Sequence, residues 1–483
     1  MRARVYRDWM VHLRHRMSRS FVAPPSARRR QLAYRLTLAQ LEAGLPRGKR
    51  AFASPVPDAR LIRAIPLAGL FRKRLTLLSH NPKAVVLCAG EGSRLRPLTF
   101  SKPKHLLPVA GTPILGHVLE TLAAAGLDEV ALVVGHRPEA VQRYVGDGSQ
   151  WRLNVTYITQ EQPLGLADAI SQAREFVGTD PFIVYLGDNL LEDGISDFVT
   201  DFVAGDAQAS LLLKEVEDPR RYGVVVLDDQ QRVVRLEEKP ADPPSNLAIV
   251  GVYAFTAAIF DAIAHTKPSA RGELEITDAI QYLVEHKASV TARVMTGFWE
   301  DAGEPKALLR ANRKYLDLIT GEMQGRVSAD SVIEGEVRIG KGTRIVNSRI
   351  VGPCLIGQNC VIENSTLLSY VMIGDGCAID DSLLEDCLIQ HNCRIAHLAA
   401  GLSSSVLGES VRIAGGEPML GPQRMILGDM AQISPCRGRF RLPSWPGTPR
   451  VEIQHELIWL LRTTPEASRH PNRGADSGHT PGA

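Results

Sequence analysis

Glycines and cations are concentrated just after a short apolar run, and their types and spacing suit the binding of phosphate groups. The run, Ala84 to Leu87, predicts a buried parallel strand, and Gly90 and Gly92 follow it in a turn. Four cations come within about a dozen residues of that turn: Arg94, Arg96, Lys102 and Lys104. Glycine turns let backbone N–H groups approach phosphates, and nearby cations balance the phosphate charge. The stretch therefore predicts a triphosphate site.

The same turn does not match the two common nucleotide motifs. A Gly-x-Gly pair alone is equally compatible with a plain tight turn. The third glycine of the dinucleotide fingerprint is missing, because Arg94 stands where helix–sheet packing would begin, and no P-loop Gly-Lys-Ser/Thr is present. These absences argue against a nicotinamide-dependent dehydrogenase and against a P-loop NTPase.

Two distant aspartates are candidates for a metal site. Asp188 follows an apolar run, Phe182 to Leu186, and Asp301 follows the short segment Phe298-Trp-Glu. A single acidic residue in a turn is commonly only a cap or turn residue. A pair of aspartates at strand ends, however, supplies the oxygen ligands that Mg²⁺ prefers. The pair predicts a Mg²⁺ site beside the glycine turn.

The elements that must position these residues alternate between strands and helices from Pro82 to about Thr320. Further apolar runs predict strands at 130–134, 182–186, 209–213, 224–227 and 250–255, with helical segments between them. This pattern is typical of an α/β domain with a mixed, mostly parallel, Rossmann-like sheet, in which ligands bind at the carboxyl ends of the strands. Residues 113–126 predict a scaffold helix that ends at Gly126 and contains a packed, non-catalytic His117.

The pattern G-x-G-x-R-L-R-P-L-T, followed by P-K-x-L-L-P, resembles the signature of sugar-1-phosphate nucleotidylyltransferases. Later motifs, in order, resemble those of long-form glucose-1-phosphate thymidylyltransferases, and the resemblance extends to about Ser434. These motifs are GDGSQW at 146–151, Gln160 with PLGLA at 163–167, LGDN at 186–189, RYGVVV at 221–226, LEEKP at 236–240, PPSNLAIVGVY at 243–253, RGELEITDAI at 271–280 and W-x-D-x-G at 299–303.

The resemblance implies a role for each matching residue. It assigns the nucleotide to Ala89, Gly90, Gly92, Ser93, Arg94, Gln160 and Gly165. It assigns the sugar phosphate to Gly223, Glu238, Lys239 and Ile249. Arg94 and Lys104 become the catalytic cations, and Asp188 and Asp301 the Mg²⁺ ligands. One departure is Ala302, where the family commonly has Thr, and the lost hydroxyl is expected to weaken Mg²⁺ binding.

The implied reaction is a Mg²⁺-dependent, in-line transfer from dTTP to glucose-1-phosphate that gives dTDP-glucose and pyrophosphate for deoxysugar (rhamnose-type) biosynthesis. Gln160 can pair with thymine or with uracil, so a UTP- or GTP-using relative remains an alternative. A second alternative is a non-catalytic regulatory or scaffold relative. Retention of Arg94, Lys104, Asp188, Lys239 and Asp301 together argues against this alternative.

A second rhythm begins at Ile333. Apolar positions step by 6, 6 and 5 residues, and glycines recur every 17 residues at Gly340, Gly357 and Gly374. Hexapeptide periodicity of this kind predicts a parallel β-helix, which is left-handed in the family. We expect this domain to serve assembly, as a homo-oligomer formed through the β-helix or the catalytic domain. Acyltransferase activity through His391 or His397 is the alternative.

Composition and charge divide the 483 residues into four parts. Residues 1–80 carry 18 Lys or Arg against 3 Asp or Glu, and we expect a poorly ordered basic extension. The nucleotidyltransferase domain is expected at 81–322, the β-helix with its end cap at 327–434, and a flexible tail at 438–483. Seven cysteines without a C-x-x-C pair predict small buried residues. Without an apolar leader or span, we expect a cytoplasmic protein with no membrane or nucleic-acid partner.

Overall fold

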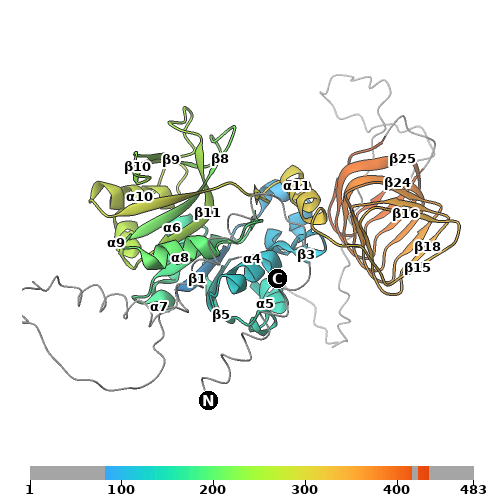
Figure 1. The fold of residues 1–483 in the computed structure, drawn as a ribbon, viewed down its shortest axis with the longest axis horizontal. Coiled ribbons are helices and arrows are strands. Elements are labelled where there is room, and N and C mark those ends of the chain that lie inside the picture. Colours follow the sequence, from blue (N-terminus) through green and yellow to red (C-terminus); the bar gives the residue numbers. More distant parts are fainter. Residues whose placement is uncertain (1–81, 136–137, 416–421, 434–483) are drawn as a thin grey trace, which may run out of the picture. The chain divides into compact units, whose positions relative to one another are not determined.

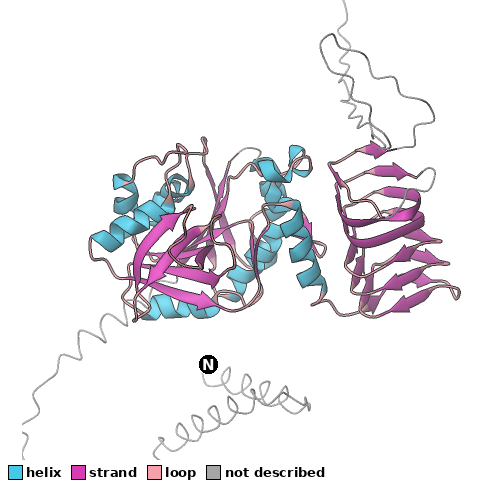
Figure 2. Ribbon diagram, turned by 90° about the horizontal axis from the view of Figure 1, so that it is seen from above, coloured by secondary structure: helices cyan, strands magenta, loops and turns pink. Residues whose placement is uncertain are grey.

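The structure is a computed structural model that describes residues 82–135, 138–415 and 422–433 (Figures 1 and 2). The expected basic extension at 1–80, the expected tail at 438–483 and Cys436 lie outside the described residues. Two bodies of secondary structure follow one another along the described chain. The first is an α/β fold and the second is a stack of short parallel strands.

The α/β fold is built on a mixed sheet, as the strand pattern predicts, and this sheet has nine strands, of which six were predicted. Strand β1 is parallel to β4 and β6, whereas β11 is antiparallel to β6 and β8. The predicted alternation with helices holds only for the first half. Strands β8 to β11 follow one another without helices, because antiparallel neighbours need only short connections. The strands are β1 (Lys83–Cys88), β4 (Glu129–Val134), β5 (Asn154–Thr159), β6 (Phe182–Leu186), β8 (Ala209–Glu215), β9 (Gly223–Leu227), β10 (Val233–Glu238), β11 (Leu247–Phe255) and β12 (Val290–Met295).

Helices cover both faces of this sheet (Figure 1). One apolar layer joins the sheet to α6, α7, α9 and α10, and the other joins it to α4, α5 and α8. Helix α4 is the predicted scaffold helix, and Gly126 follows it with φ +76. None of the described helices is long and apolar enough to cross a membrane. The helices are α4 (Ile114–Ala124), α5 (Pro138–Val145), α6 (Leu166–Gln172), α7 (Arg174–Val177), α8 (Ser196–Ala204), α9 (Ala258–His265), α10 (Ile276–Glu285) and α11 (Pro305–Leu316).

The carboxyl ends of three parallel strands bring the predicted site segments to one edge of the sheet. The glycine turn follows β1, Gln160 follows β5 and Asp188 follows β6. Beyond β6, strand β7 (Asn189–Leu191) pairs with β13 (Trp299–Asp301), so Asn189 lies opposite Asp301. Three short 3₁₀ turns shape the loop after β1: η1 (Ser93–Leu95), η2 (Leu98–Phe100) and η3 (Lys104–Leu106). A fourth, η4 (Ser149–Trp151), precedes β5, and β2 (Pro108–Val109) pairs with β3 (Thr112–Pro113) ahead of α4.

The second body is the predicted parallel β-helix (Figure 2). In the middle coils each strand pairs in register with the strand 17 residues further on, for example Ile339 with Ile356 and Ile356 with Ile373. Nine of the ten predicted apolar positions are buried, and the tenth, Ile333, packs against their cluster. The periodicity therefore identified the core of this body. Its strands are β14 (Glu322–Met323), β15 (Arg326–Val327), β16 (Val332–Glu334), β17 (Val337–Ile339), β18 (Arg344–Val346), β19 (Arg349–Val351), β20 (Cys354–Ile356), β21 (Val361–Glu363), β22 (Thr366–Leu367), β23 (Val371–Ile373), β24 (Ala378–Ile389), β25 (Arg394–Leu407), β26 (Arg412–Ala414), β27 (Ile426–Leu427) and β28 (Gln432–Ile433).

Cysteines occur in the core of the β-helix and in the core of the α/β fold. All six described cysteines are buried and free, which confirms the prediction for these six. Five of them lie in the β-helix cluster, where thiols such as Cys360 and Cys393 donate to backbone carbonyls of the next coil. Burial raises the pKa of the Cys354 and Cys387 thiols to about 12. These thiols are therefore protonated and unreactive at neutral pH.

The repeated glycines are required by the close approach of stacked coils. An added Cβ at Gly340 would lie 2.6 Å from the carbonyl carbon of Gly357, and one at Gly374 would lie 2.8 Å from the backbone nitrogen of His391. We expect Gly340→Ala to lower the free energy of unfolding by about 2 kcal/mol or more, because backbone atoms cannot move aside cheaply. Thermal unfolding checks this, with Lys341→Ala at the adjacent exposed position as the control. Equal melting temperatures for the two variants would contradict it.

Candidate active site

The loop after β1 closes around one lysine side chain. Gly92 has φ +66, and a Cβ there would lie 3.0 Å from Cβ of Lys104. A Cβ at Gly90 would lie 3.2 Å from the Lys104 Nζ. The Thr99 hydroxyl donates to the Gly92 carbonyl at 2.8 Å and fixes the turn. The structure thus brings the predicted nucleotide loop, including Ala89 and Ser93 at its flanks, against the predicted catalytic Lys104.

Lys104 forms an ion pair with Asp188, so a predicted catalytic cation and a predicted metal ligand are in contact. Burial opposes the charge on both groups, but their mutual attraction raises the pKa of Lys104 and lowers the pKa of Asp188 to about 2. The other Asp188 oxygen accepts from the Asn189 amide at 3.0 Å. The side-chain carbonyl oxygen of Asn189 in turn accepts a hydrogen bond from the Trp299 indole N–H at 2.6 Å. This chain of hydrogen bonds holds the Asp188 carboxylate in one orientation.

Asp301 completes the predicted pair of carboxylates. Burial, and then the negative charge of Asp188, raise the pKa of Asp301 to about 6. Its Oδ1 is buried without a hydrogen-bond partner. A buried carboxylate oxygen without a protein partner fits a cation ligand, because such groups are normally satisfied. Among the described residues, no group of three or more Asp, Glu, His or Cys side chains could hold a metal ion. A metal at this site would therefore be bound by Asp188 and Asp301 together with oxygen atoms of bound ligands.

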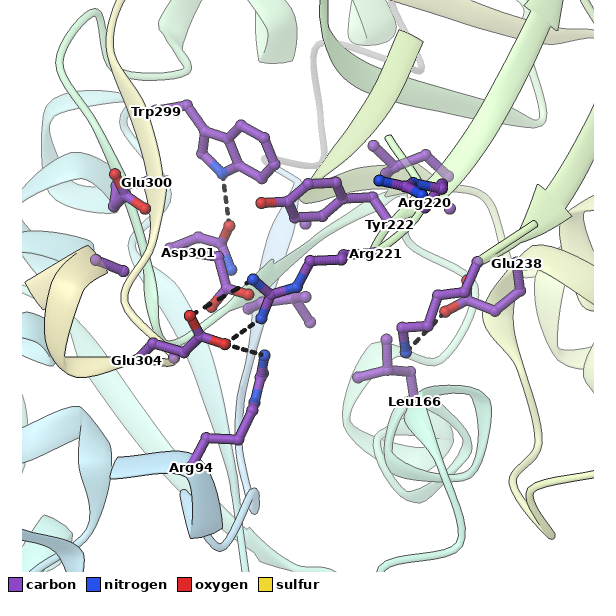
Figure 3. A pocket seen from close by; sticks show the side chains of 18 of the residues that line it. Arg94, Leu166, Arg220, Arg221, Tyr222, Glu238, Trp299, Glu300, Asp301 and Glu304 are labelled. Atoms are coloured by element: carbon purple, nitrogen blue, oxygen red, sulfur yellow. Dashed lines mark hydrogen bonds and ion pairs between the residues drawn. The ribbon is translucent and has the colours of Figure 1, made fainter. Parts of the chain in front are cut away.

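Arg94 reaches across the loop toward Asp301 and meets a carboxylate from the start of α11 (Figure 3). Its Nη1 lies 3.8 Å from Oε1 of Glu304, which also pairs with Arg221. These two guanidinium groups, Arg221 first, lower the pKa of Glu304. One carboxylate therefore balances two cations, and the excess positive charge faces the site. An incoming phosphate would find this charge already assembled.

A cavity of about 500 Å³ lies beside Arg94 and Asp301 and contains all four predicted sugar-phosphate residues (Figure 3). Glu238 is the best anchored of these. Its Oε1 is 3.1 Å from the Lys239 Nζ and its Oε2 accepts from the Thr277 hydroxyl at 3.3 Å. Tyr222 and Trp299, with ring centroids 5.0 Å apart, form an aromatic wall. The remaining predicted pair is Gly223 and Ile249. Such a mixture of aromatic and charged lining suits a polar ring that bears a phosphate.

The predicted base-reading residues lie at a separate point of the same edge. Gln160 is buried after β5, and its amide nitrogen donates to Asp168 at 2.6 Å. Gly165 has φ +111, and a Cβ there would lie 2.6 Å from the Leu274 carbonyl oxygen, so only glycine fits. Because the Gln160 nitrogen is occupied, its carbonyl oxygen is the group available to a base. Neither residue lines the cavity that the predicted sugar-phosphate residues line.

Several residues of the site carried no prediction. Asp168 orients Gln160, and Arg221 shares Glu304 with Arg94. Arg271 pairs with Glu275 at 2.7 Å and lies 3.4 Å from Glu238. Arg221 and Arg271 open two of the motifs quoted above, RYGVVV and RGELEITDAI, so motif membership was a usable signal. Asp168 lies three residues beyond Gly165 at the start of α6 and offered no such signal.

The structure also places two further predicted features, Ala302 and the two histidines of the β-helix. The Ala302 methyl packs in an apolar cluster with Leu95 and Leu98, and its backbone N–H donates to the Asp188 carbonyl at 3.0 Å. His391 and His397, the candidates for acyl transfer, contact Asp375 and Asp381, respectively. His391 is half-buried in a turn, and His397 is exposed within β25, where its Nδ1 is 3.1 Å from the Asp381 carboxylate.

A glycine loop at the edge of a mixed α/β sheet, next to a buried lysine–aspartate pair, is suited to phosphoryl chemistry without a covalent nucleophile. The fold and site thus define the chain as an enzyme of the nucleotidyltransferase class. Comparisons with known proteins narrow this class to a family. The nucleotidyl transferase family matches residues 83–318.

Named relatives agree with that match. A glucose-1-phosphate thymidylyltransferase of Streptomyces griseus is 40% identical over 363 residues, which are 73% of this chain and 99% of the relative. One of the same name from Streptomyces antibioticus is 47% identical over 56% of this chain and 76% of the relative. The low-salt glycan biosynthesis nucleotidyltransferase Agl11 of Haloferax volcanii is 45% identical over 54% of this chain and 73% of the relative. The chain belongs to the nucleotidyl transferase family, among its sugar-1-phosphate nucleotidyltransferases, and the predicted resemblance is confirmed.

Proposed function

We propose that the enzyme transfers a thymidylyl group from dTTP to glucose-1-phosphate and releases pyrophosphate, as an entry step to deoxysugars. The observation that carries this is the shared cavity, in which the sugar-phosphate residues lie beside Arg94 and Asp301. The names of the Streptomyces relatives support the choice of both substrates. We also propose that residues 81–322 act as the catalytic domain and residues 327–434 as the β-helix domain.

The nucleotide would occupy the loop after β1. Backbone N–H groups around Gly90 and Gly92 would receive the phosphates, with Arg94 and Lys104 as cations on either side. The Gln160 carbonyl oxygen would accept the N–H of a pyrimidine ring, which thymine and uracil both offer. Asp168 keeps that oxygen free by holding the amide nitrogen.

The sugar phosphate would occupy the cavity. Glu238 would accept hydrogen bonds from sugar hydroxyls, and Lys239 would face the phosphate of the sugar. Lys239 pairs with Glu238 here, so the cation and the hydroxyl acceptor lie within 3.1 Å of one another. A sugar-1-phosphate, whose phosphate is bonded directly to the sugar ring, would therefore contact Lys239 and Glu238 at the same time.

Asp188 and Asp301 fit a Mg²⁺ ion, because the Asp188 carboxylate is buried, the Asp301 carboxylate is half-buried, and the Asp301 Oδ1 is unsatisfied. When bound, Mg²⁺ supplies neutralisation of phosphate charge. The side chains supply the rest. An oxygen of the sugar-1-phosphate attacks the α-phosphorus of dTTP, the bond from that phosphorus to the bridging oxygen breaks, and pyrophosphate leaves with both electrons of that bond. Arg94 would stabilise the charge that develops on the transferred group, and Lys104 the charge beside it.

Pyrophosphate release by the purified full chain tests the proposal. Glucose-1-phosphate would be paired with dTTP, UTP, GTP, CTP and ATP in turn, with Mg²⁺. Release that needs both substrates and is fastest with dTTP is expected. Faster release with another nucleotide would overturn the choice of base, and no release with any pair would overturn the activity.

Glu238→Gln is expected to raise the KM for glucose-1-phosphate about tenfold or more, because a charged hydrogen-bond acceptor for the sugar is lost. The KM for dTTP should stay within about twofold, since Glu238 lies in the cavity and not at the glycine loop. Steady-state kinetics with each substrate varied checks this. The adjacent Glu237, which pairs with Arg235 on the exposed side of β10, gives the matched control Glu237→Gln. Equal changes in both variants would contradict the assignment.

A further inference from the structure

The loop that carries the catalytic cations also contacts the β-helix. The Lys102 Nζ lies 2.5 Å from Oε1 of Glu409, 2.8 Å from Oε1 of Gln390 and 3.5 Å from Oδ2 of Asp429. The Ser101 hydroxyl donates to the same Asp429 oxygen at 2.6 Å. The Lys102 side chain is only 14% exposed, although it is charged. A lysine this buried is normally held by partners of opposite charge.

The three partners form one corner of the β-helix. They follow β24, β25 and β27, whose ends pair in register, so they lie on three successive coils. Asp429 is fixed in advance, because its Oδ1 accepts the Glu409 backbone N–H at 2.7 Å and leaves Oδ2 for the loop. We call Gln390, Glu409 and Asp429 the acidic corner.

Apolar and backbone contacts surround the acidic corner. A Cβ on Gly428 would lie 2.9 Å from the Pro97 carbonyl oxygen, so the coil touches the loop backbone directly. One apolar cluster joins the loop to α11 and to the β-helix. Its loop members include Leu95, Leu98 and Leu107, and its β-helix members are Met372, Leu388 and Val406. The loop is therefore packed between two other elements.

The contact segment lies between the two points at which the loop meets the active site. Before it, Thr99 holds the Gly92 carbonyl, and after it, Lys104 pairs with Asp188. Ser101 and Lys102 are separated from these residues by only one or two positions along the chain. Any movement of Lys102 would therefore displace Gly92 and Lys104.

We infer that Lys102 is a positioning residue through which the β-helix fixes the nucleotide loop. The acidic corner holds Lys102, and Lys102 holds the segment that carries Arg94 and Lys104. The β-helix thereby contributes to catalysis without touching a substrate. The inference goes beyond the proposed function and uses it only to name the nucleotide as the ligand of the loop.

Lys102→Gln tests the inference in the full chain. It leaves Glu409 and Asp429 close together without a cation, so the loop should separate from the coil. A displacement of about 1 Å can lower a rate by up to about 10²-fold. We expect the KM for dTTP to rise about tenfold or more and kcat to fall, with the KM for glucose-1-phosphate little changed. Lys102→Arg should restore part of the loss, and Glu409→Gln should give a smaller change in the same direction.

Arg313→Gln is the matched control. Arg313 of α11 forms a two-pronged ion pair with Asp386 of β24 at 2.5 Å, so it joins the same two bodies but not the loop. Both variants should lower the melting temperature, and only Lys102→Gln should alter the KM for dTTP. Equal kinetic effects in the two variants, or an unchanged KM in Lys102→Gln, would overturn the inference.

Hydrogen exchange of the peptide that spans residues 90–107 gives a readout that does not depend on turnover. Exchange should become about tenfold or more faster in Lys102→Gln and stay unchanged in Arg313→Gln. Unchanged protection in Lys102→Gln would overturn the inference even in an inactive preparation. Failure of the wild type to release pyrophosphate would instead count against the proposed function, so the two failures are distinguishable.

Discussion

Asp188→Asn is expected to lower kcat by about 10³-fold while the protein stays folded. Asp188 is the carboxylate on which Lys104, Asn189 and the predicted metal converge. The substitution removes one of two carboxylates and leaves Lys104 without its ion-pair partner. Because the pKa of Asp188 is held near 2, the wild-type group is charged throughout the neutral range, and the loss should be independent of pH there. Pyrophosphate release measured against Mg²⁺ concentration checks the prediction.

Asp180→Asn is the matched control for this variant. Asp180 precedes β6 and Asp188 follows it, so the two residues mark opposite ends of one strand. Asp180 also pairs with a lysine, Lys83, at 2.9 Å. It lies at the amino end, away from the ligand edge, and its substitution should change kcat by less than about twofold. Turnover of Asp188→Asn within about tenfold of the wild type would contradict the role given to Asp188.

The β-helix was the most predictable part of the fold, because its information is local and repeated. Steps of 6, 6 and 5 residues identified apolar positions such as Ile356 and Ile373, which pair with each other across coils. The reason for the glycines was not visible in the sequence. Gly357 and Gly374 are needed because the next coil passes directly over them, which is a distance between chain segments and not a backbone preference.

In the catalytic fold, the sequence located residues better than it located their partners. Strand ends predicted that Gly90 and Asp188 meet at one edge, because parallel strands share their carboxyl side, whereas Gln160 was assigned to the site only by the motif resemblance. The sequence could not predict that Lys104 would pair with Asp188, 84 residues away. Such a partner depends on side-chain reach across the sheet edge, and neither local propensity nor motif spacing encodes that reach.

The contact between Lys102 and the acidic corner shows the same limit at longer range. Lys102 and Glu409 are 307 residues apart, and each occurs in a segment whose local pattern is already explained. Lys102 reads as one more cation of a phosphate loop, and Glu409 as a polar residue of a β-helix turn. Only their juxtaposition gives Lys102 a separate role and connects the repeat to the site.

Arg94→Gln is expected to lower kcat by about 10³-fold with almost no change in the melting temperature. The Arg94 side chain is 55% exposed, and its ion pair with Glu304 spans 3.8 Å, so it contributes little to folding. Its value to catalysis is larger, because a guanidinium placed on developing phosphoryl charge accelerates related transfers by 10³-fold or more. Steady-state pyrophosphate release together with thermal unfolding checks both halves of this prediction.

Arg96→Gln separates the charge of Arg94 from the general charge of the loop. Arg96 lies two residues further on, is similarly exposed and pairs with Glu91 at 3.4 Å. A site that needed only positive potential would lose activity equally in the two variants. A site that needs a guanidinium beside Asp301 would lose it only in Arg94→Gln, because Arg94 alone of the two reaches Gly303 and lines the cavity. Comparable losses in both variants would therefore replace a positioned catalytic cation with simple electrostatic attraction of the nucleotide.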